Sequence, residues 1–284
     1  MYGWALATFC TRHIAAWVGH RWSCALSHHP LQKAHQHSRF VEEFCSLCVH
    51  CMFGWWGLHL IPGAWWQNPS SLWTADYDAD EDLNTFMCHQ LCSWSIVAFL
   101  CVFVDQRRKD FVQMTLHHIV TIGLVLGSFY VQEVRMGAMI AILHNLSDVF
   151  ISMTKVFNYL KFHGREYYFA TEVCFVLNMV SWITMRLYYF AVCLVPIFRD
   201  HVIKKGAFTW THLWSGSIAW GDTLPIVQWI MVTKLQILAI MHWIWFGMMV
   251  RIAIRLTHGA QPEKVSVEEY EGKGEEKEHG IKQQ

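Results

Sequence analysis

Six long apolar blocks constrain the fold of this chain more than any other feature of its sequence. A helix needs about 20 mostly apolar residues to cross a bilayer, and blocks of this kind lie at roughly 44–61, 86–104, 114–132, 135–152, 169–195 and 224–254. Only 15% of the 284 residues are charged, whereas a soluble domain usually carries about a quarter. The sequence therefore predicts an all-α, polytopic membrane protein with about six transmembrane helices.

Charges in the loops predict how these spans are oriented, because cytosolic loops carry an excess of Lys and Arg. Residues 1–40, the loop 105–113 and the chain after 254 hold four, three and five of these residues, whereas the acidic loop 62–85 holds none. The loop 196–223, with three, departs from this alternation. We expect both termini to lie in the cytosol.

Three parts of the chain follow from this pattern. Residues 1–40 are expected to form a cytosolic or interfacial segment, and residues 41–258 the six-helix membrane domain. Residues 259–284 are too polar to fold alone, so a solvated cytosolic tail is expected there. The formal net charge is zero, so nucleic acid is not an expected partner.

Ionisable side chains inside the spans are the candidates for function, because charge is costly at membrane depth. His117 and His118 lie near the start of the third span, and His144 and Asp148 lie near the end of the fourth. Since a very short turn joins these two spans, the four side chains are expected at one depth in the cytosolic half. His144 and Asp148 share a helix face, which Ser152 continues.

These residue types indicate acid–base or acyl-transfer chemistry. His is the natural general base near neutral pH, and an Asp beside a His fixes its tautomer and stabilises its cation. The cluster suits proton abstraction from an amine or hydroxyl, or attack by imidazole on an activated acyl group. A purely structural, hydrogen-bonded role is the alternative. Arg186, Lys234 and His242 are also buried by position, with Arg186 expected in the lumenal half of the fifth span and Lys234 near the middle of the sixth. Structural and functional roles remain equally open for them.

A metal site is not expected. His117 and His118 point about 100° apart on a helix, so at most one of them shares a ligand set with His144 and Asp148. None of the 18 His forms the H-x-x-x-H or H-x-x-H-H boxes of membrane di-iron enzymes. The C-x-x-C-x-x-C series that begins at Cys45 lies in an apolar stretch without a second ligand pair, so we interpret it as packing.

A longer pattern resembles the Lag1 motif of ceramide synthases, which belong to the group of proteins with a TRAM–Lag1–CLN8 homology domain. It comprises R-R-K-D-F-V-Q-M-T-L-H-H-I-V-T (107–121), R-M-G (135–137), L-H-N-L-S-D-V (143–149) and K-V-F-N-Y-L-K (155–161), in family order and spacing. The resemblance implies helices that enclose a lipid-binding cavity in the endoplasmic reticulum membrane. It also implies dimers, either of this chain or with related synthases.

The resemblance further implies a reaction. The family joins a fatty acyl group from acyl-CoA to the amino group of a sphingoid base, with membrane lipid around the site and no metal or redox cofactor. Carried over by position, the catalytic residues are His117, His118, His144 and Asp148. The residues expected to bind substrate are Arg107, Arg108, Lys109, Asn145, Ser152 and Arg186. The first three of these suit CoA phosphates, with ordinary positive-inside anchoring as the alternative.

Two positions depart from the family pattern. Asn145 stands where the family usually has Asp, and an amide cannot be an anion, so a required carboxylate would be missing. His242 lies further from its L-Q pair than the late His of the family, so that role is not carried over to it. The alternative function is that of a non-enzymatic lipid-binding or lipid-sensing member of the same group. A fatty acyl elongase is disfavoured, because no His precedes the pair at H-x-x-H-H spacing.

Overall fold

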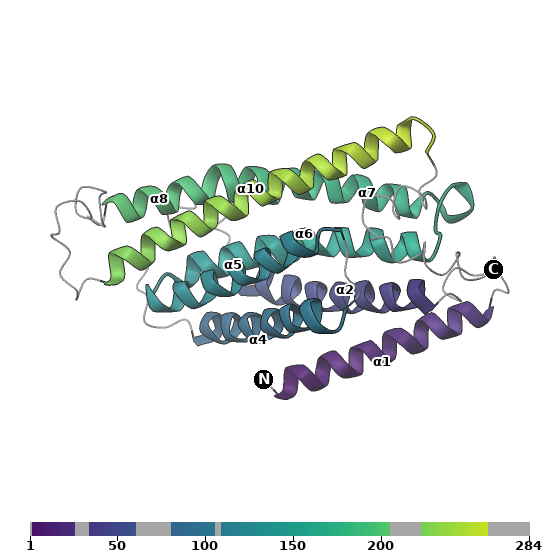
Figure 1. Ribbon diagram of the computed structural model, residues 1–284, viewed down its shortest axis with the longest axis horizontal. Coiled ribbons are helices and arrows are strands. Elements are labelled where there is room, and N and C mark those ends of the chain that lie inside the picture. Colours follow the sequence, from purple (N-terminus) through teal and green to yellow (C-terminus); the bar gives the residue numbers. More distant parts are fainter. Residues whose placement is uncertain (1, 26–33, 61–80, 106–108, 205–222, 261–284) are drawn as a thin grey trace, which may run out of the picture.

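The computed structural model describes residues 2–25, 34–60, 81–105, 109–204 and 223–260. These residues form long helices joined by turns, with no strand among them (Figure 1). The elements are α1 (Tyr2–Ala25), α2 (Ala34–Leu60), α4 (Glu81–Phe103), α5 (Phe111–Tyr130), α6 (Val134–Tyr159), η3 (Arg165–Tyr167), α7 (Ala170–Ser181), η4 (Trp182–Leu194), α8 (Val195–Lys204) and α10 (Thr223–Thr257).

Five helices among the described residues are long and apolar enough to cross a membrane. They are α4, α5, α6, the continuous helix Ala170–Lys204 and Ile226–Thr257 of α10. The prediction of an all-α, polytopic membrane protein is confirmed. The sixth expected span, 44–61, lies almost wholly inside α2, which is not one of the five. Helix α2 is less apolar than these five because it contains four His together with Arg39, Glu42 and Glu43.

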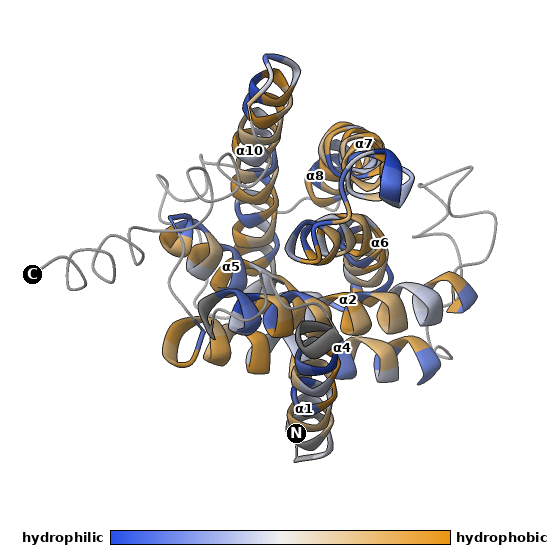
Figure 2. Ribbon diagram, turned by 90° about the vertical axis from the view of Figure 1, so that its right-hand side faces the viewer, coloured by the Kyte–Doolittle hydropathy of each residue, from blue (hydrophilic) through white to orange (hydrophobic). Residues whose placement is uncertain are grey.

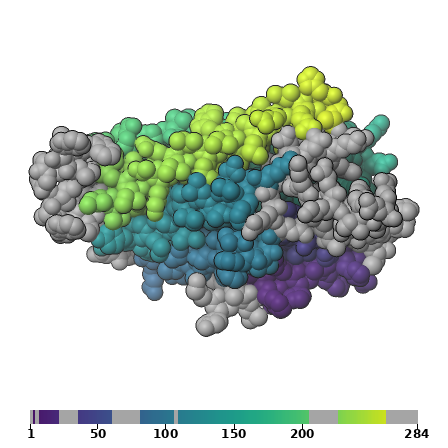
Figure 3. Space-filling model, in the orientation of Figure 1, coloured from purple at the N-terminus to yellow at the C-terminus, as the bar shows by residue number. Residues whose placement is uncertain are grey.

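Helix α6 lies at the centre of the bundle. In its apolar window 56% of the residues are buried, against 22–39% in the other four candidate spans. Figure 2 shows α6 flanked by α2, α5 and the helix that comprises α7 and α8, and α6 packs most extensively against α2 and α7. Figure 3 shows α10 running along α5 on one face of the molecule.

Close approach of the backbones holds this bundle together. Lipid tails are as apolar as a protein core, so helices in a membrane associate through van der Waals packing and interhelical hydrogen bonds. A Cβ atom at Gly57 would lie 2.5 Å from Cγ1 of Ile142, and one at Gly127 would lie 2.9 Å from Sδ of Met231. These two glycines let α2 approach α6 and α5 approach α10.

The continuous helix Ala170–Lys204 changes its hydrogen-bonding pattern in the middle. Residues Trp182–Leu194 form a π-helix, which is rare and often marks functional sites. Pro196 follows just after the π-helix, inside the continuous helix, where its missing N–H removes one backbone hydrogen bond. The expected loop 196–223 was therefore wrong at its start, because the helix continues to Lys204. Residues 205–222 lie outside the described part of the chain.

The helix α6 also extends further than expected. The predicted loop 153–168 begins only after Tyr159, and Lys155 lies on α6 with its Nζ 3.1 Å from Oε1 of Glu43 on α2. Since α6 rises about 16 Å between Asp148 and Tyr159, Asp148 lies about three turns from the helix end. The expectation that it lies one turn below the end is corrected by this extension.

Within the expected segment 1–40, residues Tyr2–Ala25 form helix α1, which packs against α2 and α4. Nη2 of Arg12 lies 2.6 Å from Oδ1 of Asp105, just beyond the end of α4. Nε2 of His37 lies 3.1 Å from the carbonyl oxygen of Ala16. The tail after residue 260 lies outside the described residues, so the expected boundaries 1–40, 41–258 and 259–284 stay predictions.

Candidate functional site

The short turn between α5 and α6 aligns the two helices that carry the predicted cluster. Only Val131–Glu133 separates the helices, and the backbone N–H of Glu133 donates to the carbonyl of Ser128 at 2.9 Å. Gln132 takes a positive φ of 60° to close this turn. The two helices run antiparallel, so residues near the start of α5 face residues around the middle of α6.

Arg186 joins three helices at the centre of the site. Its side chain is only 2% exposed. From η4 its Nε donates to Oγ of Ser147 at 2.6 Å, and its Nη2 donates to the carbonyl of His144 at 3.3 Å. The same Nη2 forms an ion pair with Asp148. The guanidinium lies 4.3 Å from the ring centroid of Trp182.

These contacts define what Arg186 does. An Arg has five N–H donors, and protein groups on α6 and α10 engage those on Nε, Nη1 and Nη2. The sequence predicted Arg186 in the lumenal half of its span, whereas the structure places it level with residues 144–148 of α6. The span is longer than expected at its far end, which moves Arg186 towards its middle. We interpret Arg186 as a residue that positions the cluster.

His144 occupies the middle of the cluster and is 4% exposed. Its Nδ1 lies 2.7 Å from the carbonyl oxygen of Ile140, and its Nε2 lies 3.2 Å from Nε2 of His242 on α10. Nε2 of His242 is also 3.2 Å from Nη1 of Arg186. The ring of Phe190 packs edge-on against the imidazole of His144 at 5.2 Å.

Hydrogen-bond polarity fixes the protons of this pair. A carbonyl only accepts, so Nδ1 of His144 carries a hydrogen, and an Arg N–H only donates, so Nε2 of His242 offers its lone pair. In neutral His144 the Nε2 also carries a lone pair, and two lone pairs then face each other. The lone pair of His242 Nε2 is already engaged by Nη1 of Arg186. Nε2 of His144 therefore remains available to accept a hydrogen bond or a proton.

His117 and His118 complete the cluster from α5. The ring centroid of His117 lies 6.4 Å from that of His144 and 5.4 Å from that of Trp245. Nδ1 of His117 is buried without a hydrogen-bond partner among the described residues. His118 is 8% exposed and lies within Coulombic range of Asp148. The structure thus brings all four predicted catalytic residues together, with Asp148 joined to the cluster through Arg186.

Asn145 and Ser152 face α2 instead. Nδ2 of Asn145 donates to the carbonyl of Ala141 at 2.8 Å, and its Oδ1 accepts a hydrogen bond of 3.0 Å from Nδ1 of His50. Oγ of Ser152 lies 3.4 Å from Oγ of Ser46. Consecutive helical residues point about 100° apart, which turns Asn145 away from the histidines. The amide at this position therefore does not remove a carboxylate from the histidine cluster.

Replacing the buried Asn145 by leucine is expected to lower the free energy of unfolding by about 1–3 kcal/mol, because the half-buried N–H of His50 loses its acceptor. His50→Leu in the same chain should add little, since the pair acts as one unit. Thermal unfolding of the two single variants and the double variant measures this coupling. Losses that simply add in the double variant would contradict the pairing.

The basic residues predicted to hold CoA phosphates are only partly described. Lys109 is exposed in the turn immediately before α5. Arg107 and Arg108 lie outside the described residues. Lys109 is therefore at the same end of α5 as the histidine pair, as a residue at the mouth of the site would be.

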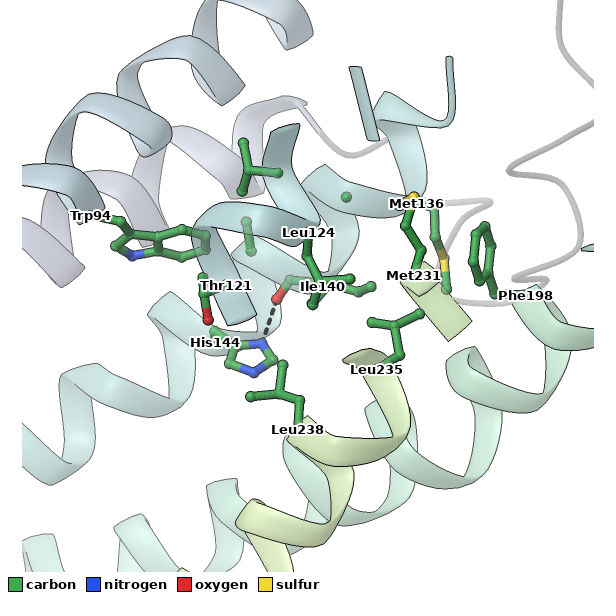
Figure 4. Close-up of a pocket in the computed structure, with 13 residues that line it drawn as sticks. Trp94, Thr121, Leu124, Met136, Ile140, His144, Phe198, Met231, Leu235 and Leu238 are labelled. Carbon is green, nitrogen blue, oxygen red and sulfur yellow. Dashed lines mark hydrogen bonds between the residues drawn. The ribbon is translucent and has the colours of Figure 1, made fainter. Parts of the chain in front are cut away.

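An apolar cavity begins at His144. Its volume is ≈ 30 Å³, and it lies among α4, α5, α6, α8 and α10. Figure 4 shows His144 and Thr121 at one end of it, with Met136, Met231 and Phe198 at the other. From His144 to Met136 the helix α6 rises about 12 Å. The cluster therefore stands at one end of a small, narrow and mostly apolar cavity.

His242 is the site residue that the sequence left unassigned. It is fully buried on α10 and touches both Arg186 and His144. The available signal was an ionisable side chain inside an apolar helix, but nothing in the sequence indicated which helix it faces. Ser147 was not singled out either, although it accepts the shortest hydrogen bond that Arg186 makes outside its ion pair.

The fold and the cluster together define a polytopic membrane protein with an ionisable site at membrane depth beside an apolar cavity. The family model of the TLC domain, TRAM–Lag1–CLN8, matches residues 39–251. The chain belongs to this family. The matched residues include every member of the cluster, from His117 to His242.

Curated relatives carry related names. The chain is 39% identical to ceramide synthase LOH2 of Arabidopsis thaliana over 106 residues, which are 37% of this chain and 33% of the relative. It is 32% identical to ceramide synthase hyl-1 of Caenorhabditis elegans over 163 residues, 57% of this chain and 41% of the relative. It is 29% identical to sphingosine N-acyltransferase lag1 of Schizosaccharomyces pombe over 227 residues, 78% of this chain and 55% of the relative. The chain thus spans between a third and somewhat over half of their lengths.

Proposed function

We propose that this protein transfers a fatty acyl group from acyl-CoA to the amino group of a sphingoid base such as sphinganine. The observation that carries the proposal is the group of buried imidazoles at one end of an apolar cavity, with the partnerless Nδ1 of His117 and the available Nε2 of His144. Relatives named ceramide synthase or sphingosine N-acyltransferase support the same reaction.

The cavity and the cluster have separate tasks in this reaction. The acyl chain enters along the small apolar cavity, which must widen as the surrounding helices separate, and the thioester lies at the histidine end. The nucleotide of acyl-CoA stays in the cytosol, where Arg107, Arg108 and Lys109 bind its phosphates. Arg186 holds Asp148 and His242 in place and does not itself contact substrate.

Proton transfer is the chemical problem that the histidines solve. A sphingoid base amine is protonated at neutral pH, as the similar ammonium of Lys is. Nδ1 of His117 takes the first proton, and the free amine attacks the thioester carbon. The C–N bond forms, the carbonyl electron pair moves onto oxygen, and the tetrahedral intermediate then expels CoA as a thiolate. The nitrogen loses its second proton to Nε2 of His144.

The protons in this reaction are accounted for. Of the two protons that leave the nitrogen, one is returned to the CoA thiolate and the other is released to water. His118 and Asp148 stabilise the positive charge that His117 acquires. No metal or redox cofactor takes part in this scheme. The site stays in the plane of the endoplasmic reticulum membrane, with both chain termini in the cytosol, and the protein acts as a dimer with itself or with a related synthase.

Labelled acyl-CoA and sphinganine supplied to membranes that contain this chain test the proposal directly. Host cells that lack their own ceramide synthases are needed, so that background activity is absent. Formation of labelled N-acylsphinganine is the expected result. Membranes that hold the folded chain but form no amide with saturated acyl-CoAs of any length would support the lipid-sensing alternative instead.

A further inference from the structure

The buried hydroxyl of Thr121 does not follow the hydrogen-bonding pattern of four other threonines in the spans. The hydroxyls of Thr115, Thr154, Thr184 and Thr233 all donate to the carbonyl one turn earlier in their own helix, at 2.8–3.0 Å. Such bonds satisfy a polar group that would otherwise be buried without a partner. Thr121 differs, because its Oγ1 is buried and has no hydrogen-bond partner among the described residues. A buried hydroxyl left in this state is unfavourable unless a ligand uses it.

The position of Thr121 indicates which ligand. Its side chain is 6% exposed and lines the apolar cavity. Thr121 follows His117 by one turn on α5 and stands at the same end of the cavity as His144 (Figure 4). Of the other lining residues near this end, Leu124 and Leu238 are hydrocarbon and Trp94 carries only an indole N–H, which cannot accept a hydrogen bond. An acyl chain that enters the cavity offers one acceptor here, its carbonyl oxygen.

We propose that Thr121 is a catalytic residue whose hydroxyl donates a hydrogen bond to the acyl carbonyl oxygen and stabilises the negative charge that develops on it. This role rests on the proposed acyl transfer. When the amine attacks, the carbonyl electron pair moves onto oxygen, and a donor already aimed at that oxygen needs no reorganisation. Because the lining of the cavity is mostly apolar, the donor acts in a medium of low dielectric constant, where its effect is large.

Kinetics of the purified full-length chain test the role of the hydroxyl. Thr121→Val keeps the shape of the side chain and removes the donor, and is expected to lower kcat by about 10²–10³-fold with little change in KM. Thr121→Ser restores the donor and should recover most of the rate. Thr115→Val, on the same helix with its hydroxyl bonded to Phe111, is the matched control and should keep the wild-type kcat. Wild-type kcat in Thr121→Val, or an equal fall in Thr115→Val, would overturn the proposal.

A binding measurement separates this proposal from the proposed function. The infrared carbonyl stretch of palmitoyl-CoA labelled with ¹³C at the carbonyl is recorded in complex with each variant. A hydrogen bond from Thr121 lowers the stretching frequency in the wild-type chain and in Thr121→Ser, but not in Thr121→Val. If this shift is present while no amide forms, Thr121 binds the carbonyl and the proposed function fails. An identical stretch in wild type and Thr121→Val refutes the role of Thr121, even if the chain is an active acyltransferase.

Discussion

Replacing Arg186 by methionine is expected to lower the free energy of unfolding by about 3–5 kcal/mol, because it leaves Asp148 charged and without its cation inside the bundle. The value should lie towards the lower end, since the side chain of Asp148 is 23% exposed. The substitution also removes the hydrogen bonds to Ser147, His144 and His242 that join η4 to α6 and α10. Thermal unfolding of the detergent-solubilised protein measures the loss.

The exposed Arg199 provides a matched control. Arg199 lies on α8 and pairs with its neighbour Asp200, and both side chains are about half exposed. Arg199→Met should change the stability by no more than about 0.5 kcal/mol. Adding Asp148→Leu to Arg186→Met should recover part of the stability, because no lone charge then remains. Equal unfolding of the two arginine variants would show that the buried ion pair is not what holds these helices in place.

Replacing His117 by glutamine is expected to lower kcat of the proposed acyl transfer by about 10²–10⁴-fold, the usual contribution of a general base. Glutamine is close in size to histidine but has no basic nitrogen. Because Nδ1 of His117 has no hydrogen-bond partner among the described residues, little structural support is lost. The rate with labelled acyl-CoA and the unfolding temperature are measured on the same preparation.

His59→Gln serves as the control for this experiment. His59 is exposed on α2, and its Nδ1 lies 2.8 Å from the carbonyl oxygen of Trp55 in its own helix. This variant should keep both its rate and its unfolding temperature. If His117→Gln unfolds much earlier than His59→Gln and keeps its rate per folded molecule, His117 has a structural role and another group is the base.

The sequence predicted those parts of the structure that depend on local pattern. Runs of apolar residues located five of the helices, and the short turn between the third and fourth runs implied that His117, His118, His144 and Asp148 lie close together. These inferences need only helix geometry and the spacing of residues within about 40 positions. The apolar composition of the cavity also follows from helices that are hydrophobic on most sides.

The features that the sequence did not predict depend on how helices distant in the chain are rotated and on how far they extend. The depth of Arg186 was wrong because the helix continues to Lys204, through a π-helical segment that no residue pattern announces. Asn145 was assigned to the substrate, but the rotation between adjacent residues directs it to His50 on α2. His242 is 98 residues from His144 in the chain, and only the packing of α10 shows that they touch.

The three-residue connection between α5 and α6 has a consequence for motion. A three-residue connection allows little relative movement of α5 and α6, so the two helices form a stiff hairpin. His117 therefore stays opposite His144 when the other helices of the bundle move. The cavity is lined on its other sides by α4, by α10 and by the helix that carries Phe198. In the proposed reaction, separation of these outer helices would admit the lipid, while the hairpin keeps His117 and His144 aligned.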